Sequence, residues 1–167
     1  MTLIELNGLS PDQATAEFLR CCGSAVWARE MTRLRPYRDV KSLHATADRT
    51  WLSLSEHDWL EAFSHHPRIG DGSALEKKFA ATAVWATNEQ KGTQGASREV
   101  LEKLKFMNQD YEKRFPHVFL ICATGKSAQE MLENLESRLD NDPKRELTIA
   151  SGEQMKITRL RLEKLLS

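Results

Sequence analysis

The sequence lacks an excess of either charge, a long apolar run, and a terminal targeting pattern. Lys and Arg together number 24, and so do Asp and Glu, so no net field would draw the chain to nucleic acid or to an anionic membrane. No apolar stretch approaches the roughly 20 residues that cross a bilayer. The N-terminal residues do not resemble a leader, and the C-terminal KLLS differs from the Ser-Lys-Leu peroxisomal address. We therefore expect a cytoplasmic protein with neither nucleic-acid nor membrane partners.

Cysteine is scarce, and a phosphate-binding loop is missing. The three cysteines are Cys21, Cys22 and Cys122; an odd number with two adjacent suits a reducing compartment better than a disulfide scaffold. The segment GKS at 125–127 lacks the earlier glycine of a nucleotide-binding loop, because Phe119 or Leu120 would have to supply it. These absences exclude two common classes, the small disulfide-linked domain and the nucleotide-binding protein of this type.

What the sequence does contain is a series of apolar residues at spacings of three and four, which predicts helices with one buried face. Each series follows a residue that favours a helix start, either serine or aspartate, in two cases with proline next to it. Helices are expected after residues 10, 24, 39, 55, 97, 127 and 142, with another at about 75–90. A chain of 167 residues suits one domain. The fold class is therefore all-α, a single domain over 1–167 with about seven to eight helices.

One stretch departs from this helical pattern. VFLIC at 118–122 is apolar on both faces and rich in residues that favour strands. A single strand would have no partner with which to form a ladder. We interpret this stretch as an extended, buried connector between two helices.

The segment HHPRIGD at 65–71 is the most unusual in the chain. Histidine titrates near neutrality and can transfer a proton at working pH, and a proline after His66 would restrict its backbone. A different interpretation is that the imidazoles only cap the preceding helix. A third makes His65, His66 and Asp71 metal ligands, although adjacent histidines rarely converge on one ion and no HExxH-like spacing supports them.

Two further polar positions are candidates for a site. Glu89 and Gln90 precede a glycine-rich turn, where a carboxylate and an amide could bind a hydroxyl or ureido group, or could simply form a solvated helix end. Arg161 lies between two leucines and four residues after Ile157, so its guanidinium is expected to reach the interior. A buried arginine needs an anionic or carbonyl partner.

Five segments occur in an order that resembles the family of 2-oxo-4-hydroxy-4-carboxy-5-ureidoimidazoline (OHCU) decarboxylases. They are HPRIG at 66–70, EQ at 89–90, FLICA at 119–123, RLDND at 138–142 and KITRLRL at 156–162. The likeness covers nearly the whole chain, including NGLS at 7–10 and FSHHP at 63–67. The resemblance implies an all-helical homodimer that converts OHCU to (S)-allantoin and carbon dioxide without a cofactor or a metal.

The resemblance also implies roles for individual residues. His66, Glu89 and Arg161 would be catalytic, with His66 as the proton donor. The substrate-binding residues would be Pro67, Ala86, Glu89, Gln90, Phe119, Leu120, Ile121, Cys122, Ala123 and Arg161. Ala86 departs from the family pattern, in which a small hydroxyl residue is expected, so one hydrogen bond to the substrate would be missing.

Two other classes of function are weighed against this one. In a non-catalytic helical interaction module, both histidines would be structural and the basic C-terminal helix would bind a partner. In a metal-dependent hydrolase of a related ureide, the paired histidines would be ligands.

Overall fold

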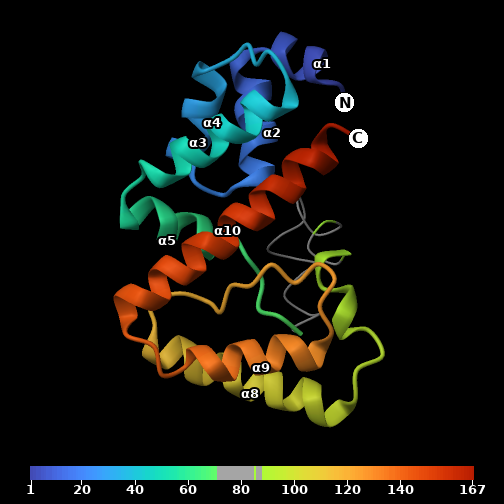
Figure 1. The fold of residues 1–167 in the computed structure, drawn as a ribbon, viewed down its shortest axis with the longest axis vertical. Coiled ribbons are helices and arrows are strands. Elements are labelled where there is room, and N and C mark those ends of the chain that lie inside the picture. Colours follow the sequence, from blue (N-terminus) through green and yellow to red (C-terminus); the bar gives the residue numbers. More distant parts are fainter. Residues whose placement is uncertain (71–84, 86–87) are drawn as a thin grey trace. The chain divides into compact units, whose positions relative to one another are not determined.

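The computed structural model describes residues 1–70, 85 and 88–167, and within these ranges it contains eight α-helices, one short 3-10 helix and no strand (Figure 1). The all-α prediction is confirmed. The helix expected at about 75–90 falls mostly outside the described residues. These residues divide into two units: unit 1 comprises Met1–Ala62 with Gln154–Ser167, and unit 2 comprises Phe63–Glu153.

Apart from the first, which follows Thr2 and was not predicted, the short helices of unit 1 begin at the capping residues read from the sequence. Ser10 and Asp39 each form a capping box, in which the cap and the third helical residue bond each other's backbone amides. Ser24 caps the helix that lies between these two in the sequence, through its hydroxyl. The helices are α1 (Leu3–Gly8), α2 (Pro11–Cys21), α3 (Ala25–Arg33), α4 (Val40–Leu52) and most of α5 (Glu56–Ser64). Residues 154–165 of α10 (Pro143–Leu165) complete the unit.

The core of unit 1 is aromatic. Phe18 meets Trp27 edge to face with ring centroids 5.9 Å apart, and Tyr37 meets Phe18 in the same way at 6.3 Å. The indole Nε1 of Trp27 donates to the carbonyl of Ala47 at 3.1 Å, so its polar atom is paired although the side chain is fully buried. Leu19 of α2 is 37% exposed, because it follows the buried Phe18 and therefore lies about 100° around the helix from it.

Unit 2 contains the long helix α8 (Arg98–Arg114), helix α9 (Ala128–Arg138), residues 143–153 of α10, and the 3-10 helix η1 (Lys91–Thr93). Helices α8 and α9 pack side by side (Figure 1). The core between them includes Leu104, Tyr111, Met131 and Leu135, all fully buried. Phe106 of α8 is 59% exposed although it is apolar, since two residues after Leu104 the helix has turned about 200°.

The stretch between α8 and α9 is an extended connector, as predicted. Phe119, Leu120, Ile121 and Ala123 are buried, and Cys122 is partly exposed. No strand is assigned to them or to any other part of the chain that the structure describes. Within the same described ranges, no helix is both long and apolar enough to cross a membrane.

Candidate active site

The two adjacent histidines have different surroundings. Helix α5 ends at Ser64, and the backbone N–H of His66 donates to the carbonyl of Phe63 at 3.0 Å, which closes a turn before Pro67. His65 is exposed, whereas His66 is only 7% exposed and Pro67 is buried. The turn and the proline together fix the backbone at His66, and of the two imidazoles it is the one placed in the interior.

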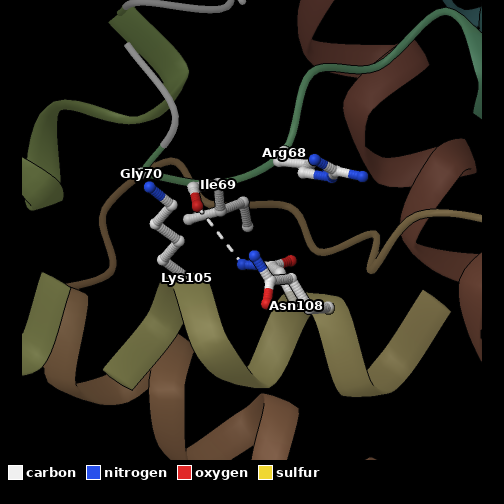
Figure 2. A pocket seen from close by; sticks show the side chains of 6 residues that line it. Arg68, Ile69, Gly70, Lys105 and Asn108 are labelled. Atoms are coloured by element: carbon white, nitrogen blue, oxygen red, sulfur yellow. Dashed lines mark hydrogen bonds between the residues drawn. The ribbon is translucent and has the colours of Figure 1, made fainter. Parts of the chain in front are cut away.

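The residues after His66 are attached to α8 and to Gln90. Arg68 forms a two-pronged ion pair with Glu112 at 2.6 and 2.7 Å. The side-chain amide of Asn108 donates to the carbonyl of Ile69 at 3.3 Å (Figure 2). The N–H of Gly70 donates to Oε1 of Gln90 at 3.1 Å, with Gly70 at φ +81°, a conformation that favours glycine. The 66–70 segment and Gln90, both predicted site elements, therefore meet.

A small cavity lies beside this segment, lined by Arg68, Ile69, Gly70, Lys105, Asn108 and Gln109 (Figure 2). Its volume is about 20 Å³, which is enough for roughly one water molecule. It is therefore too small to be the site of a ureidoimidazoline.

Glu89 is buried and precedes a turn that lies close to the end of the connector. Its side chain is 8% exposed, and the turn that follows brings Gly92 close to Lys126. A Cβ built at Gly92 would overlap the carbonyl oxygen of Lys126 and lie 2.8 Å from its carbonyl carbon. Burial, and then the Glu153 and Glu89 carboxylates, raise the pKa of the Cys122 thiol. Two predicted site elements, the segment that contains Glu89 and the connector, therefore lie near each other in unit 2.

Several backbone groups of the connector already have protein partners. The carbonyl of Leu120 accepts from Nη1 of Arg138 at 2.8 Å. The N–H of Cys122 donates to Oε2 of Glu153 at 2.7 Å, and the carbonyl of Ala123 accepts from the N–H of Lys126 at 3.0 Å. The N–H of Cys122 and the carbonyls of Leu120 and Ala123 are therefore bonded within the protein.

Arg161 belongs to unit 1, where it is 3% exposed. Its position between two leucines predicted this burial. Its Nη1 donates to the carbonyl of Arg20 at 3.4 Å, a long contact. Burial raises the pKa of Cys22 to about 12, and the positive charge of Arg161 opposes that rise.

Residues 7–163 match the model of the OHCU decarboxylase family. The chain belongs to the OHCU decarboxylase family. It is 39% identical to a uric acid degradation bifunctional protein of Arabidopsis thaliana over 90% of this chain and 47% of that protein. It is 26% identical to an OHCU decarboxylase of Haloferax volcanii over 97% of this chain and 94% of that one. The chain thus spans about half the length of the plant relative.

Two solved structures that are similar to this chain have the same fold. A crystal structure of OHCU decarboxylase in the presence of (S)-allantoin matches with a TM-score of 0.75 and 37% identity, over 90% of this chain and 96% of that chain. A crystal structure of (S)-allantoin synthase matches with a TM-score of 0.71 over 98% of this chain and 54% of that one. At 17% identity, the second likeness concerns the fold alone.

Two candidate residues fall on parts of the chain that the structure does not describe. Ala86, and Asp71 of the alternative metal set, lie outside the described residues. Among the residues that the structure does describe, no three His, Cys, Asp or Glu side chains are grouped so as to hold a metal ion.

Sequence reasoning missed the residues that hold the connector. Arg138 was noted only as part of a family segment, and Glu153 was not singled out. A charged residue on a helix is usually solvated, so nothing at a single position distinguished Arg138 and Glu153 from surface charges.

Proposed function

We propose that this chain, acting as one OHCU decarboxylase-like domain over 1–167, converts OHCU to (S)-allantoin and carbon dioxide in urate breakdown. The observation that carries the proposal is the buried His66, whose backbone is fixed by a turn, in a segment that is hydrogen-bonded to Gln90 through Gly70. Glu89, which precedes Gln90 in the sequence, is also buried. Family membership supports it, as do relatives from Haloferax volcanii and Amia calva that are named as OHCU decarboxylases.

The chemistry requires no cofactor, because the substrate contains its own electron acceptor. The carboxylate is attached to a carbon next to a C=N bond. When the carbon–carboxylate bond breaks, carbon dioxide leaves and the electron pair moves into the C=N system. The resulting enol-type intermediate then takes a proton on carbon, which creates the stereocentre.

We assign the proton transfer to His66, since a single fixed donor on one face would determine the S configuration. Glu89 would accept a hydrogen bond from the hydroxyl or ureido group. Arg161 would orient the ring through its carbonyl and offset the negative charge that develops. The remaining substrate contacts are assigned to Pro67, Gln90 and Ala86, and to the connector. Backbone groups of the connector residues Phe119, Leu120, Ile121, Cys122 and Ala123 would hold the ureido end of the substrate.

A homodimer and a cytoplasmic location are part of the same proposal, and both rest on the family resemblance. Sedimentation or light scattering of the purified chain at micromolar concentration tests the dimer. A mass of twice 19.1 kDa is the expected result, and a monomer would contradict it.

The activity is tested by circular dichroism of allantoin formation. Urate and the two preceding pathway enzymes generate the unstable substrate in place, with and without this protein after EDTA treatment. Rapid, chelator-resistant formation of one allantoin enantiomer is expected. A rate no faster than the racemic background would favour the hypothesis of a non-catalytic interaction module. Activity that is lost after EDTA treatment would favour the metal-dependent hydrolase.

The adjacent histidines provide a matched pair of variants. His66→Ala should lower kcat by about 10²–10⁴-fold, the usual range for a lost general acid or base. His65→Ala should be much milder because that side chain is exposed. Equal losses from both variants, with the fold intact by circular dichroism, would contradict the assignment of the proton transfer to His66.

A further inference from the structure

Unit 2 contains a buried charged cluster that the proposed mechanism does not use. Arg138 is 6% exposed and Glu146 is fully buried, and they form an ion pair at 2.5 Å. Tyr111 donates to the Oε1 of Glu146 at 2.5 Å, and Asn141 donates to its Oε2 at 2.8 Å. Buried charges persist only when they are paired and hydrogen-bonded in this way. Both oxygens of the Glu146 carboxylate are thus hydrogen-bonded, and Arg138 uses only two of its three guanidinium nitrogens for this carboxylate.

That remaining donor reaches the connector. While Nε and Nη2 of Arg138 bond Glu146, its Nη1 bonds the carbonyl of Leu120 at 2.8 Å. The guanidinium also lies over the ring of Phe119, 4.7 Å from its centroid, a favourable cation–π distance. One side chain therefore holds two consecutive connector residues and is itself held by Glu146.

Glu153 holds the connector at a second point. It lies seven residues after Glu146 on α10, which is two helical turns, so both carboxylates are on one face of the helix. Glu146 acts on the connector through Arg138, and Glu153 accepts directly from the N–H of Cys122 at 2.7 Å.

The two attachment points lie on one edge of the connector. In an extended chain, the polar backbone groups of residues i and i+2 point to the same edge, and those of the residue between them point to the other. Arg138 bonds the carbonyl of Leu120, and Glu153 bonds the N–H of Cys122. Regular alternation along an extended chain would direct the amide and carbonyl of Ile121 to the opposite edge.

We propose that Arg138 and Glu153 are positioning residues, which hold one edge of the connector so that its other edge is presented to the ureido end of the substrate. This inference rests on the proposed decarboxylase function. A fixed connector keeps the backbone groups that would bind the ureido end in place before the substrate binds. The two residues should therefore act mainly on substrate affinity.

Glu153 offers the sharper test because its side chain is only partly buried. In Glu153→Gln a carbonyl oxygen can still accept from the Cys122 amide, whereas Glu153→Leu removes the acceptor. Glu133→Leu, an exposed carboxylate of α9, is the matched control. Arg138→Lys retains a charge for Glu146 but cannot bond Glu146 and Leu120 with the same fork.

Steady-state kinetics with substrate generated in place, and calorimetry with (S)-allantoin, give the result. Glu153→Leu and Arg138→Lys should raise KM and weaken allantoin binding about tenfold, which corresponds to about 1.4 kcal/mol. In the same variants kcat should change less than about threefold. Glu153→Gln should restore KM to within about threefold of wild type, and Glu133→Leu should leave both constants unchanged.

Three outcomes would overturn the inference. One is an unchanged KM in folded Glu153→Leu. Another is a loss of activity that follows the thermal stability of all variants, Glu153→Gln included, which indicates a purely structural role. A wild-type protein that does not accelerate the reaction refutes the proposed function first, and the inference with it. If Arg138→Lys does not fold, the comparison of KM between Glu153→Leu and Glu153→Gln is enough to test the inference.

Discussion

The two non-helical segments of unit 2 that carry the candidate site are held in different ways. The 66–70 segment is attached by an ion pair at the surface, Arg68 with Glu112, whose side chains are 47% and 24% exposed, and by single hydrogen bonds at Ile69 and Gly70. The connector is attached by Arg138 and Glu146, which are 7% and 0% exposed. Surface pairs contribute little to stability, and a broken buried pair destabilises strongly. The connector is therefore the more rigidly specified of the two.

The largest effect should come from breaking the buried attachment. Glu146→Ala would leave the Arg138 guanidinium buried without its carboxylate and the Tyr111 hydroxyl without its acceptor. We expect a loss of about 3–5 kcal/mol in the free energy of unfolding, measured by urea denaturation. Glu133→Ala, at an exposed position on α9, is the control. A loss below about 1 kcal/mol would show that the cluster does not stabilise unit 2.

The next effect concerns the turn after Glu89, which packs close to Lys126 just beyond the connector. Gly92→Ala adds a methyl that overlaps the Lys126 carbonyl, and overpacking of this kind costs about 1–3 kcal/mol. Gly152→Ala is a suitable control, because no described atom lies within 4 Å of the added Cβ and alanine favours a helix interior. Thermal unfolding should show a lower midpoint for the first variant only; equal midpoints would argue against close packing at Gly92.

A smaller effect should follow pH through His117, at the start of the connector. Burial lowers the pKa of His117, and the positive charge of Arg138 adds to this, while the carboxylate of Glu146 opposes it. The folded state therefore binds a proton less readily than the unfolded chain. The stability contributed by neutral His117 is present above its ordinary pKa of about 6.5 and is lost as pH falls below it.

This pH dependence can be measured by urea denaturation between pH 8 and pH 5. Wild type should lose stability over the lower part of that range, and His117→Asn, which does not titrate, should lose less. Identical slopes in the two proteins would mean that other groups account for the acid sensitivity.

The smallest effect is expected from the surface attachment. Arg68→Ala removes the ion pair with Glu112, and we expect a change of at most about 1 kcal/mol. The difference between Arg68→Ala and wild type should shrink further in 0.5 M salt, which screens exposed charges. A loss as large as that of Glu146→Ala would show that both segments are held with similar strength.

The helices of both units could be read from the sequence because their signals are local. Ser10, Asp39 and Ser127 each bond backbone amides three residues ahead, and the apolar spacing marks the buried face. Phe106 shows where this reasoning fails, since an apolar side chain on the solvent side looks the same in sequence as one in the core.

At the candidate site, the residue types and the backbone restraint at His66, imposed by the proline after it, follow from the amino-acid order alone. Long-range packing is needed to explain why His66 and not His65 is buried, why Gln90 meets Gly70, and why Arg138 and Glu153 hold the connector. The physical reason is sequence separation. These bonds join residues 18 to 31 positions apart, and a charged residue carries no local mark of the distant backbone group with which it will pair.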